Sequence, residues 1–302
     1  MKKIAAIDIG SNAVRLAIAE CEGTKLVITK KLRAPLRLGT EAFDKGIFSQ
    51  ATIKQAVKIF EDFSYAIDHE HVGVVKTVAT SAFRDTKNSQ DLAAAVKKSC
   101  GLTIEAIDGT LEATLVRQAI NTKLDLKGKS ALMMDIGGGS MELSILHKGV
   151  LKGARSFDVG TVRLLQQGNE LLLKREKEIE FFIQEHASKL DLTRMIGTGG
   201  NFRAMLKLKQ RITKLNKVDF VTQSELKDLH TILEHTPYLK RIKKYGMRPD
   251  RADVIMPAID LVLMIGKKVP FKRIYAPNVG LIHGVLIDLC QYKISKIKDI
   301  TN

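Results

Sequence analysis

A turn that occurs twice constrains the fold of this chain more than any other pattern. Asp8-Ile9-Gly10 ends one apolar run, and Asp135-Ile136-Gly137 ends another far along the chain. Each turn is followed by two further runs rich in Val, Ile and Leu, which indicates strands. The predicted strands cover residues 3–10, 12–21 and 24–34 in the first copy and residues 131–136, 141–149 and 150–160 in the second. A strand–glycine turn–strand–strand unit that recurs indicates an internal duplication.

Between and after the two copies, strand and helix patterns alternate, so the sequence predicts an α/β protein. The chain has 302 residues, more than one small core accommodates, which favours two domains. The polar stretch 121–130 resembles a linker. We therefore predict an N-terminal domain at 1–123 and a C-terminal domain at 124–302, whose last helix can pack back on the first domain. The predicted helices cover residues 49–70, 88–101 and 109–123, and the further strands 72–80, 102–108, 193–197 and 272–276.

The cysteines and the apolar segments favour a cytoplasmic protein without a membrane partner. Cys21, Cys100 and Cys290 lie far apart without metal-ligand spacing, so we expect free thiols rather than a disulfide framework. The apolar stretch 254–266 is interrupted by Pro257 and is too short to span a bilayer.

The charge of the chain favours an anionic partner. The net charge is +16, and residues 123–302 carry most of it, with 32 Lys and Arg against 19 Asp and Glu. Such a field attracts nucleic acid, polyphosphate or anionic nucleotides. Aromatic residues make up only 5% of the chain and Trp is absent, which argues against a base-stacking nucleic-acid platform. Two basic stretches with helical patterns, 203–217 and 238–251, are candidates for an anion track, although a solvated surface is the competing interpretation.

The glycine turns can bind phosphate. Glycine lets backbone N–H groups approach an anion closely, and an aspartate at the end of the preceding strand can hold a divalent cation beside it. A single such turn is more often a plain hairpin, but two copies favour a phosphate clamp. A third cluster, Gly197-Thr198-Gly199-Gly200, lies between a predicted strand and a predicted helix, where free N–H groups also bind anions.

The three glycine clusters, in this order, resemble those of the Ppx/GppA family of exopolyphosphatases and guanosine pentaphosphate phosphohydrolases. Four further segments carry the resemblance: 77–92, 108–115, 158–164 and 247–262. The similarity extends from about residue 4 to residue 288. It implies two actin-like (ribonuclease H-like) domains, of the superfamily that includes sugar kinases and heat-shock chaperones, with a cleft between them.

The resemblance also implies site residues for hydrolysis of a phosphoanhydride. Glu112 matches the second glutamate of a Glu-Glu pair and is the candidate for orienting the attacking water. Asp135 and Glu142 match carboxylates of the second turn, where Mg²⁺ or another divalent cation is expected. Arg84 and Arg15 match positions where a guanidinium contacts phosphate oxygens. The other candidate phosphate-binding residues are Asp8, Gly10, Ser11, Asn12, Gly137, Gly138, Gly139, Ser140, Gly199 and Gly200.

The sequence departs from the family pattern at several positions. Leu111 stands in place of the first glutamate of the pair, and Thr114 in place of an arginine. Ile282 and His283 replace an Arg-Glu pair before Gly284. Elsewhere Ala13 replaces a serine and Asn201 a small hydroxyl residue.

Three functions stay open. The first is removal of terminal phosphate from inorganic polyphosphate; the second is hydrolysis of guanosine pentaphosphate (pppGpp). The third is a catalytically weak sensor that binds polyphosphate or nucleotides. The sequence leaves the metal and a homodimer open.

Overall fold

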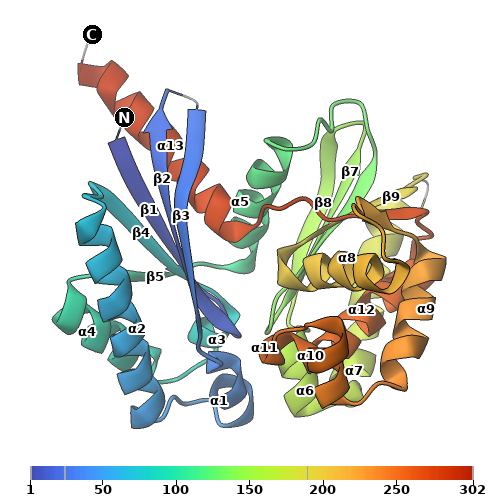
Figure 1. Ribbon diagram of the computed structural model, residues 1–302. Helices are drawn as coiled ribbons and strands as arrows, with labels where there is room; N and C mark the ends of the chain where they lie inside the picture. Colours follow the sequence, from blue (N-terminus) through green and yellow to red (C-terminus); the bar gives the residue numbers. More distant parts are fainter. Residues whose placement is uncertain (1, 24, 189, 301–302) are drawn as a thin grey trace. The chain divides into compact units, whose positions relative to one another are not determined.

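The computed structural model describes residues 2–300, except residues 24 and 189 (Figure 1). The chain forms two compact units. Unit 1 combines Met1–Ala119 with Gly280–Asn302, and unit 2 comprises Ile120–Val279. The last helix of the chain therefore groups with the N-terminal unit, and the change from unit 1 to unit 2 falls within a helix rather than in the polar stretch 121–130.

Unit 1 contains a five-stranded sheet in the order β3-β2-β1-β4-β5. β1, β2 and β3 pair antiparallel, whereas β4 and β5 continue the sheet in parallel to β1. β1 is buried over most of its length. It is apolar there because it lies at the centre of the sheet, where both of its faces are covered. The strands are β1 (Lys2–Ile9), β2 (Ala13–Glu22), β3 (Lys25–Pro35), β4 (Val74–Ala79) and β5 (Ile104–Ala106).

α2, α4 and α5 begin and end close to the residues that the sequence predicts, whereas the short helices α1 and α3 were not predicted. Ser49 caps α2, since its hydroxyl accepts a hydrogen bond from the Thr52 amide at 3.2 Å, as is typical of a helix N-cap. α4 ends at Gly101, which adopts the left-handed conformation with φ of 70°, the usual way for glycine to end a helix. The helices are α1 (Leu38–Asp44), α2 (Gln50–His69), α3 (Ser81–Arg84), α4 (Ser89–Cys100), α5 (Gly109–Asn121) and α13 (Leu281–Ile300).

Unit 2 contains a six-stranded sheet in the order β10-β11-β9-β6-β7-β8. β6, β7 and β8 pair antiparallel, and β9 and β11 continue the sheet in parallel to β6. The additional strand β10 pairs antiparallel with β11 at the edge. The strands are β6 (Ala131–Ile136), β7 (Met141–His147), β8 (Val150–Phe157), β9 (Arg194–Thr198), β10 (Phe220–Val221) and β11 (Arg273–Tyr275).

Seven helices of unit 2 surround this sheet in the described part of the chain: α6 (Thr161–Gln167), α7 (Asn169–Ala187), α8 (Gly199–Thr213), α9 (Gln223–Glu234), α10 (Tyr238–Tyr245), α11 (Pro249–Ala252) and α12 (Ile255–Lys268). Both basic stretches are less continuous than expected. α8 ends at Thr213, before the end of the first stretch. The second stretch breaks at Gly246, whose φ of 53° ends α10. A left-handed glycine at this position reverses the chain.

The two sheets confirm the internal duplication. The order β3-β2-β1-β4-β5 in unit 1 corresponds to β8-β7-β6-β9-β11 in unit 2. The two glycine turns have equal lengths, because Ile9 pairs with Val14 and Ile136 pairs with Met141. Each copy continues after its third strand into a helix of seven residues, α1 or α6.

α13 packs on β1 and β2 within unit 1 (Figure 1). It also crosses α5 so closely that a Cβ atom at Gly284 would clash with the carbonyl group of Leu115. The clash would be with backbone, which cannot move aside as a side chain can, so this crossing requires glycine.

The expectation of three free cysteines is wrong for two of them. Cys21 on β2 and Cys290 on α13 form a disulfide, with Cα atoms 5.9 Å apart. Their separation in the sequence hides this pairing, which follows from the packing of α13 on the first sheet. Cys100 is free, and burial raises the pKa of its thiol.

None of the helices that the structure describes combines the length and the apolar character needed to cross a membrane.

Glu70, which follows α2, generates a pH-dependent contribution to stability. Its carboxylate accepts hydrogen bonds from Lys3 on β1 at 2.8 Å and from Lys30 on β3 at 3.2 Å. These bonds and charges lower the pKa of Glu70 from 4.5 to about 2. A lowered pKa stabilises the fold above the unfolded-state pKa, and this contribution disappears as the pH falls through the folded-state pKa.

We therefore expect Glu70→Gln to lower the free energy of unfolding at neutral pH, because the amide loses both ion pairs. The difference from wild type should shrink between pH 4.5 and about 2. Urea unfolding across this pH range measures the effect. Asp62→Asn, an exposed change on the same helix, is the control. Parallel pH profiles for wild type and Glu70→Gln would contradict the assignment.

Candidate active site

The second glycine turn is held by the helix that follows β8. The amide of Gly137 donates to the carbonyl of Ser140 at 2.9 Å and closes the turn. The first amides of α6 then bind the carbonyls of the turn: Thr161 donates to Gly137 at 3.1 Å and Val162 to Gly138 at 2.8 Å. The side-chain Nε of Arg163 donates to the carbonyl of Gly139 at 2.9 Å.

This arrangement fixes which groups of the turn are available to a ligand. The carbonyls are bonded to α6, whereas the amides of Gly138, Gly139 and Ser140 donate to no acceptor among the described residues. A Cβ atom at Gly160, just before α6, would lie 2.5 Å from backbone atoms of Gly138 and Gly139. The close approach of α6 therefore depends on Gly160. Sequence reasoning assigned no role to this residue, although it belongs to the segment 158–164 that carries the resemblance.

The first turn repeats this construction in unit 1. The amide of Gly10 donates to the carbonyl of Ala13 at 3.2 Å. The amide of Gly39, in the first turn of α1, donates to the carbonyl of Ser11 at 2.8 Å, as Val162 does to Gly138 in unit 2. The hydroxyl of Ser11 lies 3.2 Å from that of Ser81 at the start of α3, so it already has a partner. Asn12 is buried in the same turn.

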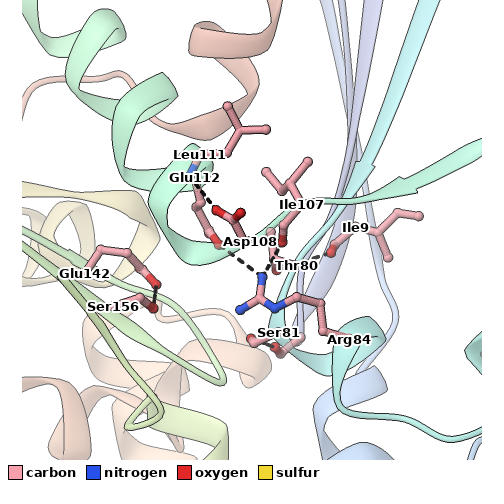
Figure 2. A network of polar contacts seen from close by, with 11 residues as sticks. Ile9, Thr80, Ser81, Arg84, Ile107, Asp108, Leu111, Glu112, Glu142 and Ser156 are labelled. Atoms are coloured by element: carbon pink, nitrogen blue, oxygen red, sulfur yellow. Dashed lines mark hydrogen bonds and ion pairs between the residues drawn. The ribbon is translucent and has the colours of Figure 1, made fainter. Parts of the chain in front are cut away.

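The two turns differ in the charge that faces the aspartate across the strands. In unit 1, Asp8 pairs in register with Arg15, and the guanidinium lies 2.8 Å from the carboxylate. In unit 2, Asp135 pairs in the same register with Glu142. Figure 2 shows the hydroxyl of Ser156 on β8 donating to the Glu142 carboxylate, at 2.8 Å. Like charges directly opposite each other destabilise a sheet unless a cation lies nearby. The predicted metal ligands are therefore neighbours, and Arg15 is occupied by Asp8.

The third glycine cluster adjoins the same carboxylate. Gly199, with φ of 84°, begins α8, and a Cβ atom there would lie 2.7 Å from Oδ1 of Asp135. The side-chain amide of Asn201 donates to the carbonyl of Ile136 at 2.9 Å and accepts from Arg251 at 2.7 Å. Asn201 thus anchors the start of α8 to the end of β6. Arg251 is only 7% exposed. The sequence places it in the candidate anion track 238–251 and in the segment 247–262, without an individual role.

Glu112 and Arg84 meet in unit 1, as Figure 2 shows. Glu112 lies in the first turn of α5 and is 9% exposed. Nη1 of Arg84, from α3, lies 3.9 Å from the Glu112 carboxylate and donates to the carbonyl of Ile107 at 2.5 Å. α3 is tied to the end of β1, since the amide of Thr80 donates to the carbonyl of Ile9 at 3.1 Å. The strand end that carries Asp8 is thereby connected to the Arg84–Glu112 pair.

The structure explains why Leu111 can replace a glutamate. Asp108 caps α5 by accepting a hydrogen bond from the Leu111 amide at 2.8 Å. Such a cap bond places residue 111 at the third helical position. A glutamate at this position reaches back to the cap amide and completes a capping box. Leu111 is exposed, whereas its neighbour Glu112 is buried. The substitution therefore changes a helix cap and leaves the buried carboxylate in place.

The other departures in unit 1 fall on β2, α5 and α13, with Ala13 buried at the start of β2. Thr114 is half-buried on α5, and Ile282 is buried on α13. Nε2 of His283 lies 3.4 Å from Nζ of Lys31 on β3. The glycine that follows in the family pattern is retained as Gly284, where the contact with α5 requires it.

We expect Leu111→Glu to raise the free energy of unfolding by about 0.5 kcal/mol, because it completes the capping box. Urea unfolding at neutral pH measures the change. Leu111→Lys is the matched control, since it also replaces an exposed apolar side chain but provides no acceptor for the cap amide. Equal stabilities of the two variants would contradict the capping role of position 111.

The comparisons with known proteins agree with this geometry. The model of the Ppx/GppA phosphatase family matches residues 17–293. Exopolyphosphatase 2 of Mycobacterium tuberculosis is 26% identical over 279 residues, covering 84% of this chain and 87% of that protein. Exopolyphosphatase 1 of the same organism is 27% identical over 166 residues, or 55% of this chain, and the match spans about half of that relative, 48%.

Among solved structures, an exopolyphosphatase from Cytophaga hutchinsonii is similar with a TM-score of 0.87 and 23% identity. The match covers 96% of this chain and 98% of that one. It confirms the expected α/β fold of two actin-like domains. Together with the family match over most of the sequence, it shows that this chain belongs to the Ppx/GppA phosphatase family.

Proposed function

We propose that this protein removes the terminal phosphate of inorganic polyphosphate by attack of water on the phosphoanhydride. The observation that carries the proposal is the second glycine turn, where amides without a described acceptor lie beside the carboxylates of Asp135 and Glu142. Phosphoryl transfer needs positioning and charge compensation more than covalent catalysis. A set of fixed N–H donors next to paired carboxylates meets both requirements. The names of the relatives support polyphosphate as the substrate.

The carboxylates fit a divalent cation such as Mg²⁺. Asp135 and Glu142 face each other in register, and Glu142 is 4% exposed. No group of three or more His, Cys, Asp or Glu that could hold a metal occurs among the described residues. Two carboxylates suit Mg²⁺, which commonly takes its other ligands from water and substrate phosphates. When bound, the cation would neutralise charge on the phosphate oxygens.

The protein's own groups account for the remaining requirements. The amides of Gly138, Gly139 and Ser140 bind the oxygens of the terminal phosphate. Glu112 accepts a proton from the attacking water and orients it, and Arg84 holds the Glu112 side chain in position. In the first turn, Arg15 compensates Asp8, so this turn favours phosphate contact over metal binding.

A nucleoside polyphosphate such as pppGpp presents the same terminal group, and its hydrolysis is the alternative within this reaction class. A sensor without turnover is the alternative outside it. The position of Leu111 supports the enzyme over the sensor. The altered residue is an exposed side chain in the first turn of α5, and the buried Glu112 is retained.

We expect Glu112→Gln to lower kcat for phosphate release from polyphosphate with Mg²⁺ by about 100-fold or more, because the amide cannot accept the proton. Phosphate release and thermal unfolding are measured together. Glu105→Gln, an exposed change on β5, is the control and should retain activity. Equal rates for wild type and Glu112→Gln would refute the catalytic role, and binding without turnover in any divalent metal would favour the sensor.

We expect Glu142→Gln to abolish stabilisation by Mg²⁺ together with activity. In EDTA, the variant and wild type should differ far less in stability than they do with Mg²⁺. Unfolding with Mg²⁺ and with EDTA measures this difference. The control is Glu185→Gln, which alters an exposed carboxylate on α7. An Mg²⁺ response that persists in Glu142→Gln would place the cation elsewhere.

A further inference from the structure

Unit 2 contains a basic pocket that the proposed reaction does not use. Its volume is about 550 Å³, and it lies between α8, the segment from Gly246 to Arg251, and the residues after β11. Five of its lining residues are cationic, and the lining includes no carboxylate and no aromatic ring. The cations are Arg203, Lys207, Arg211, Arg248 and Arg251. We call this feature the basic pocket.

The fold brings these charges together from the two basic stretches of the sequence. Arg203, Lys207 and Arg211 are spaced four residues apart and so share one face of α8, along about 12 Å of its axis. The reversal at Gly246 returns the chain toward α8 and places Arg248 and Arg251 in the same lining.

Bonds to neighbouring groups orient three of the guanidiniums. Arg203 donates to the side chain of Asn278, and Arg211 donates to the carbonyl of Tyr245. Arg251 donates to Asn201 at 2.7 Å. A guanidinium has five N–H donors in a rigid fork, so these bonds fix the orientation of each side chain in the pocket.

The pocket keeps a strong positive charge after its neighbours are considered. Asp250 lies 3.5 Å from Nε of Arg248 and 3.9 Å from Nε of Arg251, so it compensates part of their charge. Lys207 and Arg248 are exposed at the rim, whereas Arg251 is buried. A ligand can therefore reach Lys207 and Arg248 from solvent, and the buried Arg251 adds to the positive charge of the pocket.

The basic pocket adjoins the proposed phosphate cradle within the same unit. Gly199 touches Asp135, and the next residue, Gly200, lines the pocket against the Arg251 guanidinium. An anion chain held at the start of α8 can continue along the basic face of this helix. Most small-molecule sites are lined largely by apolar and aromatic groups with few charges. This lining combines five cations with six apolar side chains and no aromatic ring, so it can contact phosphates but offers nothing on which a base could stack.

We propose that the basic pocket binds phosphates of an inorganic polyphosphate chain beyond the terminal one, and so makes the enzyme favour long chains. This rests on the proposed function for its biological meaning, but the binding can be tested without turnover.

The experiment compares two double variants of the full chain. Lys207→Ala/Arg248→Ala removes the two exposed cations of the pocket rim. Lys240→Ala/Lys243→Ala removes two exposed cations of α10 outside the lining and matches the change in net charge. Binding of long-chain polyphosphate, tripolyphosphate, GTP and an RNA oligonucleotide is measured in EDTA, and KM for the two polyphosphates is measured with Mg²⁺.

We expect the pocket variant to bind long-chain polyphosphate about 10-fold more weakly than wild type, because it loses charge-assisted contacts, while tripolyphosphate changes far less. The KM values should follow the same pattern, and the α10 variant should resemble wild type. If binding follows this pattern but no variant releases phosphate, the proposed function fails and the pocket assignment stands.

Three results would overturn the proposal. Equal losses in the two double variants would indicate a general charge effect. A loss confined to GTP would assign the pocket to a nucleotide. A loss for RNA as large as that for polyphosphate would indicate an unspecific polyanion surface.

Discussion

The hydrogen bonds of the four-residue turn 137–140 fix which of its backbone groups remain available in unit 2. α6 takes the carbonyls of Gly137 and Gly138, and the amides of Gly138, Gly139 and Ser140 are left without described acceptors. A turn with mixed donors and acceptors would suit no anion, whereas a turn with its carbonyls bonded presents donors alone. The bonds between α6 and the turn depend on Gly160, because any side chain there would push α6 away from the turn. The arrangement of the turn thus depends on a residue outside the glycine-rich segment itself.

Duplication supplied two similar turns, and one register position makes them different. The residue opposite the strand-end aspartate is Arg15 in unit 1 and Glu142 in unit 2. The arginine completes an ion pair within the protein, whereas the glutamate places a second carboxylate opposite Asp135. The fold of the two copies is the same at this point. They differ in the charge at this register position and in the turns themselves, where Ser11 and Asn12 correspond to Gly138 and Gly139.

The sequence predicts much of this structure. Hydrophobic periodicity and glycine-rich turns locate the strands of both copies and the helices α2, α4 and α5, since these signals are local. Pairings between distant segments are not local: the disulfide of Cys21 with Cys290, the clash that requires Gly284, and the contact of Gly160 with the turn all depend on tertiary packing. Position 111 also needed the structure, because the cap bond to Asp108 and the exposure of Leu111 distinguish this position from the buried Glu112. A role for the basic stretch 238–251 can be inferred only from the structure, in which Gly246 reverses the chain toward α8.

The return of the chain to unit 1 at Gly280 makes unit 2 an insertion within unit 1 rather than its successor. The chain passes between the units twice, and both ends of the insertion are anchored in the same core. A strand from the N-terminal segment and a helix from the C-terminal segment are joined there by the disulfide and by packing of α13 on β1 and β2. Cleavage of the backbone at either passage would therefore leave unit 1 in one covalent piece.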